Sequence, residues 1–172
     1  MAMTDSFLQE LEMEAKTTRR VLERVPEDKM DWRPHPKSHS LGQLALHIAS
    51  VVGQVSDMLM MDSMELPSFQ QPQAASRKEV LDALDASLIK ARKQLGQVND
   101  ARLATSLPIM RSGATVMEVP RVGLLRNLLL NHQYHHRGQL TVYLRMLSVP
   151  VPSIYGPSAD EAMPLPEAGS SS

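Results

Sequence analysis

The chain has 172 residues and a formal net charge of −1, because 18 lysines and arginines nearly balance 19 acidic side chains. These charges are scattered and form no basic stripe of the kind that phosphate binding requires, which argues against a nucleic-acid partner. No cysteine is present, which excludes disulfides, a cysteine nucleophile and thiolate ligands, so any metal ion must be held by nitrogen or oxygen.

The first predicted element is a helix over residues 5–24, where apolar side chains recur at intervals of three and four between charged ones. Pro26 ends this helix. Residues 26–39 contain three prolines and the only tryptophan, Trp32, and we expect them to form a loop packed over the helices.

A second helix is predicted from Ser40 to Met61. Ser40 and Gln43 have the spacing of a capping box, in which each side chain bonds to the backbone N–H of the other residue. Four methionines gather near the end of this helix, where a core or interface role is favoured over copper ligation: Met58, Met60, Met61 and Met64.

After a connection over residues 62–75, Ser76 and Glu79 have the pattern of a second capping box, which begins a third helix extending to Leu95. Glycines inside helices cost about 1 kcal/mol each relative to alanine. We therefore expect another helix to approach closely at the three glycines that lie within predicted helices, namely Gly42, Gly53 and Gly138.

Signals are weaker before the fourth helix, where Ser112-Gly is typical of a turn and Val116-Met-Glu-Val119 suggests a short extended piece. The fourth helix is predicted to start at Pro120, whose missing N–H costs nothing in a first turn. It runs to Leu147 and is long enough to cross a whole bundle. Four amphipathic helices without convincing strands predict an all-α fold, a four-helix bundle.

The length predicts one domain over residues 1–161, followed by a disordered tail at 162–172 that is rich in proline, glycine and serine. No apolar stretch approaches the roughly 18 residues that are needed to span a bilayer. The N-terminus lacks the charged and apolar regions of a signal peptide, so a cytoplasmic location is expected.

Histidines in two of the predicted helices have the spacing of metal ligands. His132 and His136 lie four residues apart in the fourth helix, so their Cβ atoms are expected to be about 5–6 Å apart on one face. That face also carries Leu125, Leu128 and Leu129, whereas Arg126, Arg137 and Arg145 point elsewhere. His47, at the margin of the second helix's apolar stripe, could supply a third nitrogen. Three neutral nitrogens with an open fourth position are typical of a catalytic metal site.

The residues alone leave alternatives open. His135 lies at the edge of the same face and could pair with His132, although His136 is nearer the centre of the apolar stripe. A histidine on an apolar face is more often satisfied by a carbonyl or a water molecule. The imidazole and amide groups could also form a polar network at a dimer interface: His132, His135, His136 and Gln139. His35 and His39 are expected in a solvated loop.

Three segments resemble the DinB (damage-inducible) family of metalloenzymes. They are Trp32-Arg-Pro, Ser40-Leu-Gly-Gln-Leu-Ala-Leu-His-Ile-Ala49 and Asn131-His-Gln-Tyr-His-His-Arg-Gly-Gln-Leu-Thr-Val-Tyr-Leu-Arg145. The closing Val149-Pro-Val-Pro-Ser-Ile-Tyr-Gly-Pro-Ser-Ala-Asp-Glu161 is similar to the end of that family's domain. The resemblance covers residues 5–161.

The resemblance implies a four-helix bundle with up-down-down-up topology, whose long crossover the connections at 62–75 and 97–118 could supply. It also implies a divalent metal ion, zinc or nickel, held by His47, His132 and His136. His135 matches a frequent family histidine that is not usually a ligand. It is expected beside the metal ligands, as are Gln139 and Tyr143, which lie one and two turns beyond His136.

The resemblance further implies a metal-dependent enzyme. Some relatives transfer or isomerise groups with low-molecular-weight thiols such as bacillithiol, mycothiol or glutathione, and a cation on three histidines lowers the pKa of a thiol. The first expectation is a thiol-dependent S-transferase with a small-molecule substrate. The alternatives are a metal-dependent hydrolase and a non-catalytic, metal-binding helical dimer. Family members often dimerise, so a homodimer is expected, without a nucleic-acid or membrane partner.

Overall fold

The computed structural model describes residues 3–66 and 71–162. Residues 67–70 of the predicted connection lie outside this part, as does the predicted disordered tail apart from Ala162. The described helices are α1 (Met3–Leu22), the 3-10 turn η1 (Glu27–Lys29), α2 (Leu41–Met60), α3 (Arg77–Gln97), α4 (Asp100–Leu103), α5 (Arg121–Gly123), the π-helical η2 (Leu124–Asn131) and α6 (His132–Met146).

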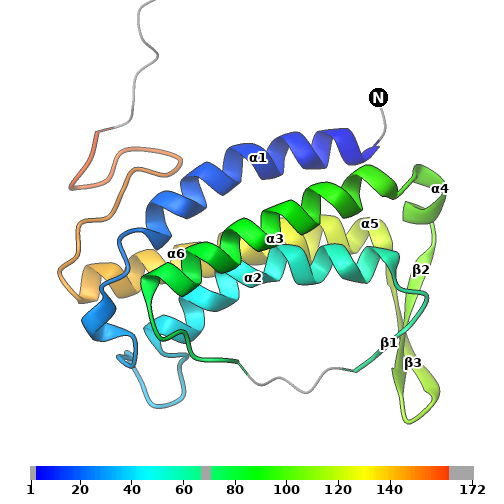
Figure 1. The fold of residues 1–172 in the computed structure, drawn as a ribbon, viewed down its shortest axis with the longest axis horizontal. Helices are drawn as coiled ribbons and strands as arrows, with labels where there is room; N and C mark the ends of the chain where they lie inside the picture. Colours follow the sequence, from blue (N-terminus) through cyan, green and yellow to red (C-terminus); the bar gives the residue numbers. More distant parts are fainter. Residues whose placement is uncertain (1–2, 67–70, 163–172) are drawn as a thin grey trace, which may run out of the picture.

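The long helices pack side by side around one apolar core. Helix α3 runs along both α1 and α2, and α2 also packs against η2 and α6 (Figure 1). Their inward faces carry the buried leucines and valines that the apolar periodicity predicts, such as Leu11, Leu44 and Leu84. Among the described residues, no helix combines the length and the apolarity that crossing a bilayer requires.

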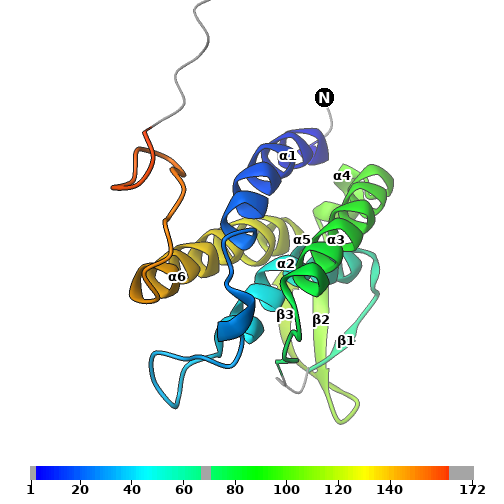
Figure 2. The same ribbon diagram turned by 60° about the vertical axis from the view of Figure 1, so that its left-hand side comes forward.

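The prediction of an all-α, up-down-down-up four-helix bundle is wrong because the chain also forms a three-stranded mixed sheet. Strand β1 (Met64–Glu65) pairs in parallel with β2 (Ser106–Arg111), and β2 pairs antiparallel with β3 (Ala114–Pro120). Figures 1 and 2 both show the sheet at one end of the helices, beyond the last turn of α2.

The predicted extended piece at Val116-Met-Glu-Val119 is confirmed as part of β3, but the rest of the sheet was hard to predict because its sequence carries little of the usual alternation. Only Leu107 and Ile109 of β2 are buried, and no residue of β3 is. A strand exposed along most of its length needs no apolar period, so the pattern that identifies half-buried strands is missing. The predicted turn is confirmed: Ser112 and Gly113 have φ angles of 50° and 81°, which reverse the chain between β2 and β3.

The predicted start of α2 is confirmed in detail. Ser40 Oγ accepts the backbone N–H of Gln43 at 3.1 Å, and Gln43 Oε1 accepts that of Ser40 at 3.0 Å. The second predicted capping box, at the start of α3, forms with one partner shifted by one residue. Ser76 Oγ accepts the N–H of Glu79, but the Glu79 carboxylate accepts the N–H of Ala75 at 2.7 Å.

The fourth predicted helix begins at Arg121, with Pro120 as its N-cap, and its central part is π-helical. The N–H of His132 donates to the carbonyl of Asn127, five residues earlier, so η2 holds more residues per turn than an α-helix. A regular helical wheel therefore misplaces residues here. Leu128 was expected on the buried face, yet it is 37% exposed, while its neighbours Leu129 and Leu130 are buried.

Arg137 lies off the histidine face as predicted, but it is not in solvent. Its guanidinium pairs with the Glu14 carboxylate of α1 at 2.7 Å and donates to Thr18 Oγ1 at 3.1 Å and to the Tyr155 hydroxyl at 2.5 Å. The side chain is 2% exposed. Helix α6 is therefore buried on the side that faces α1 as well as on the side that faces α2.

The expected close helix contact is confirmed at Gly53, which meets α3, whereas Gly42 lies close to the irregular connection before α3 rather than to a helix. A Cβ on Gly42 would lie 2.2 Å from Gln73 Nε2 and 3.0 Å from the Ala74 carbonyl oxygen, and one on Gly53 would lie 3.0 Å from Ser87 Cα. Around Gly138 no heavy atom of the described residues lies within 4 Å of the Cβ position, so the expectation of a close helix contact there is wrong.

We predict that Gly42→Ala and Gly138→Ala shift stability in opposite directions. The methyl group added by Gly42→Ala would displace Gln73 Nε2, which donates to the carbonyls of Met30 and Ala74, and should lower the free energy of unfolding by about 1–3 kcal/mol. Gly138→Ala should raise it by up to about 1 kcal/mol, because alanine favours an exposed helix. Urea unfolding followed by circular dichroism measures both, and equal midpoints for the two variants would contradict the packing argument.

Candidate metal centre

His47 of α2 meets His132 and His136 of α6. One ring nitrogen from each of the three lies within 4.8 Å of the other two. The ring centroids are 5.1 Å apart for His47 and His132, 4.6 Å for His47 and His136, and 4.4 Å for His132 and His136. The structure therefore brings together the three histidines that the sequence analysis selects, from two helices far apart in the chain.

The geometry of this histidine triad fits a small divalent ion with a modest adjustment. The two Nε2 atoms of His132 and His136 lie 2.8 Å apart. Zinc–nitrogen distances of about 2.1 Å in a tetrahedron place neighbouring nitrogens about 3.4 Å apart. A small rotation of either ring opens the pair enough to hold the ion, with His47 as the third donor.

A hydrogen bond from His136 to Gln139 orients the His136 ring to bind an ion. His136 Nδ1 lies 2.7 Å from Gln139 Oε1, an acceptor, which leaves the proton on Nδ1 and the lone pair on Nε2, toward the other histidines. His132 Nδ1 is buried and forms no hydrogen bond of good geometry with the described residues. The backbone carbonyl of Leu128 nevertheless acts on that ring and opposes the lowering of its pKa.

All three imidazoles are held in the neutral form that binds metals. Burial, then the charges of His136 and His132, lower the pKa of His47 to about 4, although a hydrogen bond to the Gln71 side chain opposes the shift. Burial likewise lowers the pKa of His136 to about 4 against the opposing Gln139 bond. The pKa of His132 is lowered by burial and by nearby His135. Near neutral pH none of the three rings carries the second proton, the one that would occupy the lone pair needed to bind an ion.

Of the other predicted site residues, Gln139 and His135 lie beside the triad, whereas Tyr143 contacts the loop at 26–39. Gln139 contacts His136, as expected for a residue that supports a ligand. His135 is exposed, and its ring centroid lies 4.9 Å from that of His136, so it flanks the triad without joining it. The hydroxyl of Tyr143 instead donates to the His39 carbonyl at 3.3 Å, and its ring meets Trp32 edge-on, which holds the loop at 26–39 against α6.

Two supporting groups were missed by the sequence analysis. Gln71, which reaches His47, lies in an irregular connection and has no pattern that marks it. The Leu128 carbonyl acts on His132 from the π-helical segment, where the i→i−4 bonds of a regular helix are replaced. Neither group could be assigned before the connection and the π-helical register were known.

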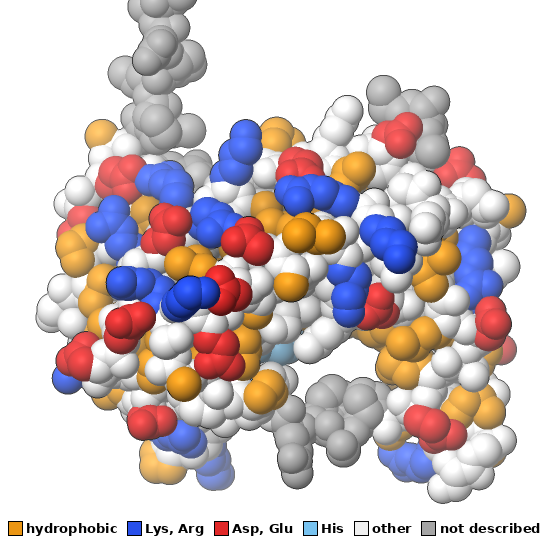
Figure 3. Space-filling model, viewed as in Figure 1, with side chains coloured by type: hydrophobic (Ala, Val, Ile, Leu, Met, Phe, Trp, Pro, Cys, Tyr) orange, Lys and Arg blue, Asp and Glu red, His pale blue; other side chains and the backbone are white. Residues whose placement is uncertain are grey.

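A cavity of about 700 Å³ adjoins the triad, and His47 and His132 form part of its lining. Most of the lining is apolar and comes from α2, η2 and the sheet, including Met58, Met61 and Met117. Figure 3 shows the molecule hollowed between the helices and the sheet, with a histidine (pale blue) at the inner edge. Among the described residues, the side of the triad that faces this cavity is largely apolar.

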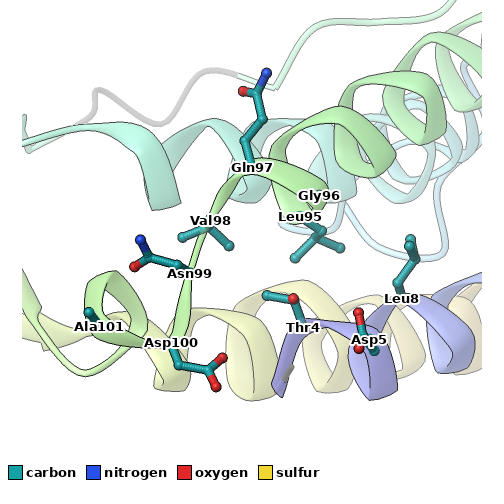
Figure 4. Close-up of a pocket in the computed structure, with 10 residues that line it drawn as sticks. All are labelled: Thr4, Asp5, Leu8, Leu95, Gly96, Gln97, Val98, Asn99, Asp100 and Ala101. Carbon is teal, nitrogen blue, oxygen red and sulfur yellow. The ribbon is translucent and has the colours of Figure 1, made fainter. Parts of the chain in front are cut away.

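A second hollow of about 550 Å³ lies between the start of α1 and the end of α3 (Figure 4). Thr4, Asp5 and Leu8 line one side, and residues 95–101 line the other. The Asp100 carboxylate accepts the backbone N–H of Met3 at 3.1 Å, so it holds the helix end in place. Among the described residues, no histidine lines this hollow, and it shares no lining residue with the cavity beside the triad.

We predict that the chelator-treated protein loses stability as the pH falls from about 6.5 toward 4. In this window histidines of the unfolded chain take up protons, whereas folded His47 and His136, whose pKa values are about 4, resist protonation. Protonation therefore favours the unfolded state. The urea midpoint should fall less steeply over this range in His136→Leu than in the parent protein, and parallel curves would contradict the assignment.

Comparison with known proteins identifies the family and agrees with the fold. The model of the DinB family matches residues 1–168. The uncharacterized protein YrdA of Bacillus subtilis (strain 168) is 27% identical over 158 residues, which cover 91% of this chain and 90% of that protein.

Solved structures of DinB-like proteins have a similar fold. One from Bacillus cereus ATCC 10987 superposes with a TM-score of 0.69 at 25% identity and covers 88% of this chain and 97% of its own. One from Bacillus subtilis superposes with a TM-score of 0.65 at 19% identity. The match covers 85% of this chain and 96% of that protein's chain. With the family model matched over nearly the whole length, the chain belongs to the DinB family.

Proposed function

We propose that this protein is a metal-dependent enzyme, a thiol-dependent S-transferase, that holds one zinc or nickel ion with His47, His132 and His136. The observation that carries the proposal is the convergence of three neutral ring nitrogens within 4.8 Å at the edge of a cavity. A divalent ion bound there supplies a Lewis acid that lowers the pKa of a thiol.

The chain's own groups prepare the site for this chemistry. Gln139 fixes the tautomer of His136, and burial keeps the three imidazoles neutral, so each retains one nitrogen lone pair. The apolar lining limits water around the reacting groups, which strengthens electrostatic interactions there. The nitrogens come from only two helices, so one side of the site is left to a substrate, as in catalytic rather than structural metal sites.

A hydrolase is less well supported, because hydrolysis generally requires a base to take a proton from water. The carboxylate in the described cavity lining belongs to Asp57, which pairs with Lys90 at 2.7 Å and accepts from Gln94 Nε2 at 3.1 Å. A free thiol has a pKa of about 8.5, against about 15.7 for free water, so it gives up its proton more readily where no base takes it, and an ion at the site would lower the pKa of either. The site therefore favours a thiol as the nucleophile.

We predict about one divalent ion per chain in protein purified without a nickel column. Elemental mass spectrometry should find the ion in the parent protein and in His35→Ala, which alters an exposed loop histidine. His132→Ala should lose it because one of three donors is removed. If the parent protein holds no ion, takes none up on titration and melts at an unchanged temperature, the triad is a polar cluster of the core.

We also predict a thiol-transfer activity that depends on the ion. Bacillithiol, mycothiol and glutathione are tested with 1-chloro-2,4-dinitrobenzene, whose thioether product is followed by absorbance. Removal of the ion or His132→Ala should slow the best pair by about a hundredfold or more, since such stabilisation is worth several kcal/mol. Metal-dependent cleavage of 4-nitrophenyl acetate without thiol transfer would favour the hydrolase instead.

A further inference from the structure

We propose that the cavity beside the histidine triad binds an uncharged apolar group of the substrate, an alkyl or aryl chain. The electrophile would carry this chain and present its reactive end to the triad. That orientation rests on the proposed function, whereas binding of the chain depends on the cavity alone.

The cavity and the triad are continuous. His47 and His132 belong to both, so a molecule that fills the cavity touches two of the three imidazoles. At about 700 Å³ the cavity lies within the range of about 300–1,000 Å³ that is usual for sites of small organic ligands. A chain held here would therefore have one end at the triad.

The charge of the lining selects against ionic groups. No lysine or arginine is among its described residues, and the Asp57 carboxylate is already paired with Lys90. A carboxylate or phosphate entering the cavity would lose its hydration without gaining a cation, which is costly. Gln54 and Gln71 offer amide groups that suit a neutral carbonyl or hydroxyl. The charged parts of a thiol such as glutathione would accordingly lie outside it.

Methionines give the wall a surface that adapts to apolar chains. Met58 lies in the last turn of α2, Met61 directly follows that helix, Met64 begins β1, and Met117 comes from β3. Thioether side chains are flexible and polarizable, so they fill irregular spaces and contact alkyl and aromatic groups well. Such a wall favours apolar ligands of varied shape over one rigid ligand.

Two arginines fix the backbone that carries this wall. Arg121 donates to the Met58 carbonyl at 3.2 Å and to the Met61 carbonyl at 2.8 Å. Arg102 also donates to the Met61 carbonyl, at 2.8 Å, and pairs with Asp62 at 3.0 Å. These bonds satisfy carbonyls at the end of α2. The methionine backbone is thus fixed while the thioether ends keep their freedom.

The rim of the cavity exposes large apolar side chains that a ligand would cover. Met117 is 57% exposed, Leu66 39% and Leu128 37%, and all three line the cavity. Burial of apolar surface is favourable, by about 25 cal/mol per Å². Ile109 and Val119 of the sheet also line the cavity, so the sheet, which a simple helical bundle would lack, completes the site.

Methyl-labelled methionine offers a direct test with 1-octanol as a neutral probe. In ¹³C-methyl spectra, titration should shift the signals of Met58, Met61, Met64 and Met117 to saturation. Met13 and Met146, which are exposed and do not line the cavity, should stay unchanged. Affinity should rise about fourfold for each methylene from 1-butanol to 1-octanol. Octanoate should bind at least about tenfold more weakly than 1-octanol, because the described lining lacks a cation.

Met117→Asp and Val116→Asp form a matched pair, since both replace exposed residues of β3 and only Met117 lines the cavity. Met117→Asp should weaken 1-octanol binding by about tenfold or more, and Val116→Asp should not. Tighter binding of octanoate, equal effects of the two variants, or shifts spread to Met13 and Met146 would overturn the proposal.

The outcome of the octanol test can be distinguished from the outcome of the metal and thiol-transfer tests. Saturable octanol binding in a protein that holds no metal ion and transfers no thiol would leave the apolar site standing and remove the enzymatic role. A metal-loaded protein that transfers thiols but fails the octanol test would overturn the apolar site alone.

Discussion

The π-helical segment η2, which ends directly before His132, sets the rotation of α6 about its axis, and the histidine triad depends on that rotation. The backbone bond from His132 to Asn127 places an additional residue in the turn before the site. Upstream of it, Leu129 and Leu130 face the core; downstream, His132 and His136 face His47. π-helical turns are rare and occur frequently at functional sites, which accords with a segment of this kind directly before the triad.

Helix α6 is buried on two sides, against α1 and against α2, and it carries polar side chains on both. The protein stabilises these two sets of polar groups in different ways. Toward α1, Arg137 keeps its charge, since Glu14, Thr18 and Tyr155 satisfy it. Removing one partner of such a buried pair typically costs about 3–5 kcal/mol. Toward α2, the histidines are instead held neutral by burial. The charged cluster fastens the C-terminal segment to α1, whereas the neutral cluster leaves lone pairs available to an ion.

The sheet gives the site a shape that helices alone would not. Strand β1 extends the chain directly beyond the end of α2, and the β2–β3 hairpin pairs beside it. These strands supply part of the apolar wall next to the triad. Under the proposed function, an ion on the nitrogen donors would activate the reactive group, and the apolar wall would select the substrate.

The sequence by itself determined the features that depend on neighbouring residues. The helix starts at Ser40 and Ser76 and the turn at Ser112 and Gly113 follow from side chains within a few positions, and the i,i+4 spacing of His132 and His136 fixes their shared face. Only the tertiary structure decided the sheet, the burial of Arg137 and the open surroundings of Gly138, because strand pairing and helix contacts join residues far apart in the chain. It also showed which histidines converge, since His47 reaches its partners through the packing of α2 on α6, while His135 remains in solvent on the same helix.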